Sequence, residues 1–382
     1  MKDFVYYSFL FLFVGIVMVD PTGKLFHLKE IVFLGILCFC FLTSKMKFYK
    51  NVVITYYVLL FIALLSICIG TFVFDSDLEG AIPYFKALAF GLIFIAISDL
   101  SIEEIIKLNY YAGIFLASFI SILIFAYVSG LFDLSWLVER MSDSETVMIA
   151  KRDLLGFDTL MFFYKTMPFC FFALIFALRR NNLILAAIIS APIIYGGSRT
   201  PMLAALAIVL YMLYDRRGRY LRLAMGAVSF FVLIYIVVLL TSPENSQGGD
   251  EIKGGVASYL IQNSSLFSHG VGAFYWDPAR ARITSTTEMT YIEMLYQYGW
   301  LFAPVVIYLF FKPFMSLYNK QNDTIIRDFA VSYLLYLVTA GTNPLLINST
   351  GMWVFACALT IEAKLKERWM FNGDWFQQNT LS

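Results

Sequence analysis

Arg199 is the residue whose position in this chain most strongly suggests chemistry. It lies in the short hairpin Ile194–Pro201, between two long apolar runs. A guanidinium stays charged at any accessible pH, and a charge near hydrocarbon is costly enough that such residues usually have a function. Amides at the start of the following run, with Gly196 and Gly197 allowing close backbone approach, would form an anion site with the guanidinium. The alternative is an interfacial arginine whose side chain snorkels to water.

A second polar segment ends where helical periodicity resumes. Glu288 precedes Tyr291, Ile292 and Leu295, which follow it at i+3, i+4 and i+7. A carboxylate that faces a polar cleft could act as a general base toward a hydroxyl. It could equally sit in the first turn of the helix and interact with the helix dipole. Glu293 lies about 140° further around the helix, so we expect it to point elsewhere and to find a polar neighbour.

The loop before Glu288 offers further candidates with two interpretations each. Arg280 and Arg282 could bind an anionic substrate or only solvate the loop. His269 fits a hydrogen-bonded structural residue better than a base, and Tyr291 could stack on a sugar ring or belong to an interfacial aromatic belt. The chain has only two histidines and no cluster at ligand spacing, so no metal and no cofactor are expected.

Composition identifies the elements that must position these residues. The 382 residues are 60% hydrophobic and 14% charged, with a mean hydropathy of +0.74. Soluble domains carry nearer a quarter charged residues, so the composition predicts an integral membrane protein. The net charge of +1 implies no nucleic-acid partner. The five cysteines all fall inside apolar runs, where thiols behave as small hydrophobes.

The hydropathy pattern predicts an all-α polytopic membrane protein, folded as a single integral membrane domain over residues 1–382. Apolar runs of roughly 15–25 residues can cross a bilayer, and about twelve are present. They fall near residues 4–19, 26–44, 52–74, 82–98, 109–132, 162–178, 183–197, 201–214, 220–241, 290–311, 325–340 and 345–361. Two long loops, at about 132–161 and 242–289, interrupt them.

Basic residues give the orientation, because short cytoplasmic loops retain Lys and Arg. Such groups follow alternate runs, as in the cluster Arg216, Arg217, Arg219 and Arg222 after the eighth. Placing them inside puts both termini in the cytoplasm and the two long loops outside. Arg199 then lies on the same outer side as those loops.

The order of these elements resembles the O-antigen polymerase and ligase superfamily. The resemblance rests on Ser198-Arg199-Thr200, on Gly270-Val271-Gly272, and on Glu288 ahead of Tyr291, Leu295 and Gly299. It covers roughly residues 190–305. Ligases of the superfamily usually have His-Asn where this chain has Glu288-Met289, which favours a polymerase.

The resemblance implies a metal-independent, GT-C-like membrane glycosyltransferase of the bacterial inner membrane. It would transfer an undecaprenyl-pyrophosphate-linked glycan to a hydroxyl of another lipid-linked repeat unit on the periplasmic face. Arg199 would hold the pyrophosphate and Glu288 would activate the acceptor, with substrate contacts from Ser198, His269, Arg280, Arg282 and Tyr291. The expected partners are the lipid bilayer and, in some members of the superfamily, a protein that regulates chain length. An O-antigen ligase and a lipid-linked sugar transporter are the alternatives.

Overall fold

The computed structural model describes residues 2–25, 28–77, 79–130, 135–154, 157–215, 249–278, 281–285, 287, 289–319, 323–342 and 345–379. Helices dominate this part of the chain. Three of them are long and apolar enough to cross a membrane, namely α3 (Lys50–Phe74), α6 (Ile102–Ser129) and α14 (Thr290–Asn319). The prediction of a largely helical chain with membrane-type apolar helices is confirmed at this level.

Most other predicted runs also coincide with helices. These are α1 (Lys2–Val19), α2 (Lys29–Leu42), α8 (Cys170–Arg179), α9 (Leu183–Tyr195), α10 (Arg199–Asp215), α15 (Thr324–Ala340) and α16 (Ser349–Asn379). The run at 82–98 is divided into α4 (Ala81–Ala89), the 3-10 turn η1 (Phe90–Ile93) and α5 (Phe94–Ile97). The run at 220–241 lies outside the described residues.

The two long loops contain regular structure, including two small antiparallel hairpins within a mostly helical chain. The first holds α7 (Ser135–Asp143) and an antiparallel hairpin of β1 (Val147–Leu154) and β2 (Phe157–Tyr164). The predicted span at 162–178 is therefore wrong in its first part, because Phe162–Tyr164 pair with β1 and α8 begins only at Cys170. The second loop holds α13 (Gly249–Asn263) and the small hairpin of β3 (Tyr275–Asp277) and β4 (Arg282–Thr284).

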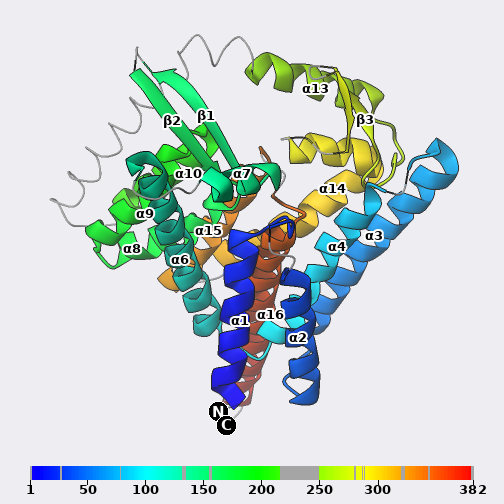
Figure 1. Ribbon diagram of the computed structural model, residues 1–382. Helices are drawn as coiled ribbons and strands as arrows, with labels where there is room; N and C mark the ends of the chain where they lie inside the picture. Colours follow the sequence, from blue (N-terminus) through cyan, green and yellow to red (C-terminus); the bar gives the residue numbers. More distant parts are fainter. Residues whose placement is uncertain are drawn as a thin grey trace.

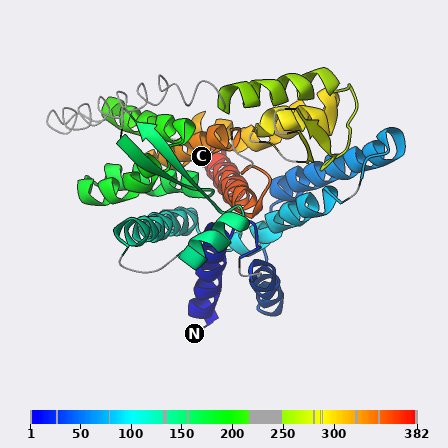
Figure 2. The ribbon, with the colours of Figure 1, turned by 45° about the horizontal axis from the view of Figure 1, so that its top comes forward.

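The helices gather around α16 (Figures 1 and 2). The first half of α16 is apolar on all sides, and Met352–Cys357 are buried, as expected of a helix enclosed by others. It contacts α1, α3, α4, α6, α14 and α15. The start of α1 and the end of α16 lie at one end of the molecule, whereas both hairpins, α7 and α13 lie at the opposite end (Figure 1). We call the latter the hairpin end.

Gly299 divides α14 into two parts. Its backbone has φ 72° and ψ 167°, a conformation that is open to glycine but costly for other residues. The amides of Trp300 and Leu301, which begin the second part, donate to the carbonyls of Ser265 and Leu266 at 3.1 Å each. The kink thus separates a long apolar segment from a short helix, Thr290–Tyr298, at the hairpin end.

Candidate functional site: a lysine-lined cavity

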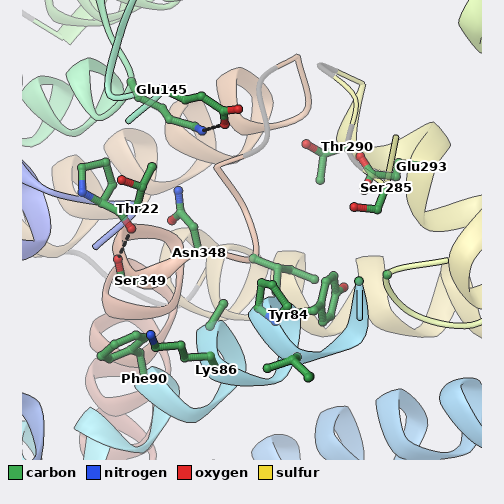
Figure 3. A pocket seen from close by; sticks show the side chains of 18 of the residues that line it. Thr22, Tyr84, Lys86, Phe90, Glu145, Ser285, Thr290, Glu293, Asn348 and Ser349 are labelled. Carbon is green, nitrogen blue, oxygen red and sulfur yellow. Dashed lines mark hydrogen bonds and ion pairs between the residues drawn. The ribbon is translucent and has the colours of Figure 1, made fainter. Parts of the chain in front are cut away.

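A cavity of about 630 Å³ opens at the hairpin end of the molecule (Figure 3). Its walls come from several parts of the chain. They are the turn at Pro21–Lys24, the start of α2, Gly80 with α4, the base of the β1–β2 hairpin, Gly272 and Ser285 of the second long loop, the first turns of α14, and residues 347–349 at the start of α16. The lining mixes charged, hydroxyl and apolar side chains, so the cavity suits a polar ligand with an attached apolar part.

Four lysines line this cavity: Lys24, Lys29, Lys86 and Lys165. Two of them have carboxylate partners. Lys86 Nζ lies 2.6 Å from Glu30 Oε1, and Lys165 Nζ lies 4.0 Å from the exposed carboxylate of Glu145. Burial lowers the pKa of Lys165, and the nearby Glu145 partly offsets this. Because the lining carboxylates are fewer than the lysines, the cavity attracts anions.

Lys29 is the most deeply buried of the four, with 5% of its surface exposed. It begins α2, and its Nζ donates to the carbonyl of Pro21 at 2.6 Å and lies 5.4 Å from the centre of the Phe90 ring. Burial lowers the pKa of Lys29 to about 8, against the attraction of Glu30 and Asp20. Within the described residues its direct partners are thus uncharged, and a buried cation of this kind favours an anionic ligand.

Glu293 provides a carboxylate on another wall of the cavity. It is 8% exposed, and one oxygen accepts from the Thr287 amide at 2.8 Å. The other oxygen accepts from Gln297 Nε2, also at 2.8 Å. Figure 3 shows Glu293 beside Ser285 and Thr290, across the cavity from Thr22 and Ser349. Its hydrogen-bond partners, a backbone amide and a side-chain amide, carry no charge.

Two glycine pairs bring the loop at 268–273 against α3 and against the residue that precedes α4. A Cβ on Gly70 would overlap Gly270, and a Cβ on Gly80 would overlap the carbonyl of Gly272. Gly270 and Gly272 have φ of 103° and 76°, and Val271 between them is buried. Gly80 and Gly272 both line the cavity. The Gly-Val-Gly sequence therefore acts by allowing two backbones to touch at the cavity wall.

Four helices begin at the cavity. Lys29 opens α2, Thr290 opens α14, and Gly80 and Asn348 directly precede α4 and α16. Helix starts carry partial positive charge and unpaired amides. They add to the lysines in favouring a negatively charged group.

Of the predicted catalytic pair, only Arg199 lies within the described residues. Arg199 is half-buried as the first residue of α10 and has interactions of its own. Neither Arg199 nor Ser198 lines the cavity. Glu288 and Arg280 lie outside the described residues, so their predicted roles stay predictions.

The other three predicted contacts, His269, Arg282 and Tyr291, do not line the cavity. His269 Nε2 donates to the Asn263 carbonyl at 2.8 Å, and the ring stacks on Tyr296 with ring centres 4.5 Å apart, which suits the structural role expected for it. Burial lowers the pKa of His269. The hydroxyl of Tyr291 donates to the Leu337 carbonyl at 2.8 Å. Arg282 is exposed on β4.

The expectation for Glu293 is confirmed in one respect, because it does find a polar helix neighbour in Gln297. The lysines and Asn348 were missed, since they come from positions 24, 29, 86, 165 and 348, with no common motif. One signal was present in the sequence. Thr290, Glu293 and Gln297 follow one another at helical spacing and form a polar stripe on an otherwise apolar helix.

Comparisons of this chain with protein-family models, with curated proteins and with solved structures give no match. The assignment of function therefore depends on the cavity and on the resemblance of the sequence motifs.

Proposed function

We propose that this chain is a polysaccharide polymerase that transfers an undecaprenyl-pyrophosphate-linked glycan to the hydroxyl of another lipid-linked repeat unit. The observation that carries the proposal is the cavity in which four lysines and a buried carboxylate line a common space. An anionic leaving group and a proton acceptor are the two requirements of this reaction. The proposal includes about twelve spans, a GT-C-like fold and a site on the periplasmic face of a bacterial inner membrane.

The lysines would bind the pyrophosphate of the donor. As the acceptor oxygen bonds to the anomeric carbon, the bond from that carbon to the phosphate oxygen breaks. The electron pair then remains on the pyrophosphate, where the positive charge of the lysines and the helix starts stabilises it. Glu293 would take the proton that the acceptor hydroxyl loses.

Glu288 remains the competing candidate for the base, because it precedes Glu293 by only five residues. In that case Glu293 would only bind the acceptor. A comparison of the two carboxyls therefore has to be part of the test.

The test uses Glu293→Gln, which preserves size but removes basicity. A general base contributes on the order of 10²–10⁴-fold in rate, so cells that carry Glu293→Gln should make only short glycans at normal levels of membrane protein. Glu288→Gln is measured beside it. The matched control is Glu103→Gln, which removes an exposed carboxylate 3.6 Å from Lys107 on α6, away from the cavity. Long glycans from Glu293→Gln would refute its role as base.

A further inference from the structure

Asn348 holds a fixed orientation at the start of α16. Its Oδ1 accepts from the amide of Gly351 at 2.7 Å, the hydrogen bond of a helix N-cap. Because Oδ1 accepts this hydrogen bond, the other terminal atom of the side-chain amide must be Nδ2. The bond therefore distinguishes the oxygen from the nitrogen of Asn348. Asn348 lines the cavity, and Figure 3 shows it between the Thr22–Ser349 wall and the Glu293 wall.

The Nδ2 of Asn348 is buried and has no hydrogen-bond partner within the described part of the chain. Buried polar groups are paired in the large majority of cases, and leaving a donor unpaired costs stability. A donor of this kind at a cavity wall suggests an oxygen atom of a ligand as its partner.

Lys29 is anchored next to this amide. The carbonyl oxygen of Pro21 accepts two hydrogen bonds. One comes from Lys29 Nζ at 2.6 Å, and the other comes from the Oγ of Ser349, the residue after Asn348, at 3.0 Å. This shared acceptor brings the start of α2 and the start of α16 together. Among the described residues, the Lys29 ammonium has no carboxylate partner and the Asn348 Nδ2 has no hydrogen-bond partner, and both residues line the cavity.

We propose that Asn348 is a binding residue for a phosphate group. Its Nδ2 donates to a non-bridging oxygen of the phosphate whose charge is balanced by Lys29. This inference rests on the proposed function, which it deepens by naming the part of the cavity that holds the phosphate.

The experiment separates this role from capping. Serine is as good an N-cap as asparagine but is too short to reach the ligand, so Asn348→Ser retains the cap and loses the donor. Binding of inorganic pyrophosphate to the purified full-length protein in detergent is measured by calorimetry. A matched control is Asn182→Ser, because Asn182 caps α9 in the same way, accepting from the Leu185 amide at 3.0 Å.

We expect Asn348→Ser to weaken pyrophosphate binding by roughly tenfold or more, the effect of one hydrogen bond to a charged group. Asn182→Ser should leave it unchanged. If Asn348→Ser binds within about twofold of the wild type while Lys29→Met loses affinity, the role of Asn348 is refuted and the proposed function stands. If the wild type binds no pyrophosphate, both are overturned.

Discussion

Replacing Lys29 with methionine tests the charge of the cavity most directly. Methionine matches the length of the lysine stem and fills its apolar surroundings but carries no charge. Lys29 is 5% exposed, so solvent screens its interaction with a bound phosphate only weakly. A charge-assisted hydrogen bond is worth about 1.5–3 kcal/mol, and two unit charges 4 Å apart interact by about 4 kcal/mol at an effective dielectric constant near 20. Lys29→Met should therefore weaken pyrophosphate binding roughly 10- to 10³-fold.

The pH dependence gives an independent test of the same group. Burial lowers the pKa of Lys29 from 10.5 to about 8, so the ammonium loses its proton as pH rises through that value. Its charged fraction falls from about nine-tenths at pH 7 to about one-tenth at pH 9. Binding that needs the charge should weaken by about tenfold over this range. Lys29→Arg should bind without this loss, because arginine keeps its proton.

The measurement is the ratio of pyrophosphate affinities of wild type and Lys29→Arg, taken by calorimetry from pH 7 to pH 9. The ratio cancels the titration of pyrophosphate itself. It also cancels the charges that face Lys29 in both proteins, which are Asp20, Glu30, Lys86 and Lys165. A ratio that stays constant, or Lys29→Met with unchanged affinity at pH 7, would refute the assignment of Lys29 to the ligand.

Three further predictions concern the fold. Asp328→Asn should destabilise the protein by about 3–5 kcal/mol, because this fully buried carboxylate accepts hydrogen bonds of 2.6 and 2.7 Å from the guanidinium of Arg179. The loss is measured as a lower melting temperature, and an unchanged melting temperature would contradict it. Gly80→Ala should disrupt the cavity wall and reduce the folded yield, because the added methyl group would overlap Gly272. Gly35→Ala is the control, because the space around Gly35 is open, and equal yields of the two variants would contradict the backbone contact. Cysteines introduced at Gly255 and Glu103 should react with an impermeant reagent from opposite sides of the membrane; labelling from the same side would overturn the orientation.

The apolar helices could be predicted because each is encoded locally, whereas α7 and α13 lie in segments predicted as loops. The apolar run 183–197 is sufficient to predict α9, and the helix in the structure begins and ends within a few residues of the predicted bounds. The β1–β2 hairpin shows where this fails. Only the six residues Tyr164–Phe169 separate Phe162 and Phe163 from the apolar segment of α8, and Lys165 is the one charged residue among the six, so hydropathy joins them. Only pairing with Met148 and Ile149, across the turn, makes them strand.

The lysines of the cavity could not be predicted in the same way. Lys29 and Lys86 each look like the solvated end of an apolar run, where basic residues are common. What distinguishes them is the neighbouring segment, since Pro21 orients Lys29 and Glu30 orients Lys86. A site assembled from several chain segments leaves no spacing to recognise.

The first turns of α14 show which face of a helix packs on the core and which face lines the cavity. Helical periodicity places Glu293 away from the face of Tyr291 and Leu295, and the structure agrees. Tyr291 and Leu295 pack on the hydrophobic core, and Tyr291 is further tied to α15 through Leu337. The opposite face, with Glu293 and Gln297, lines the cavity. Apolar residues on a helix mark the side that packs, so a carboxylate on the polar stripe of the same helix is the one that can meet a ligand.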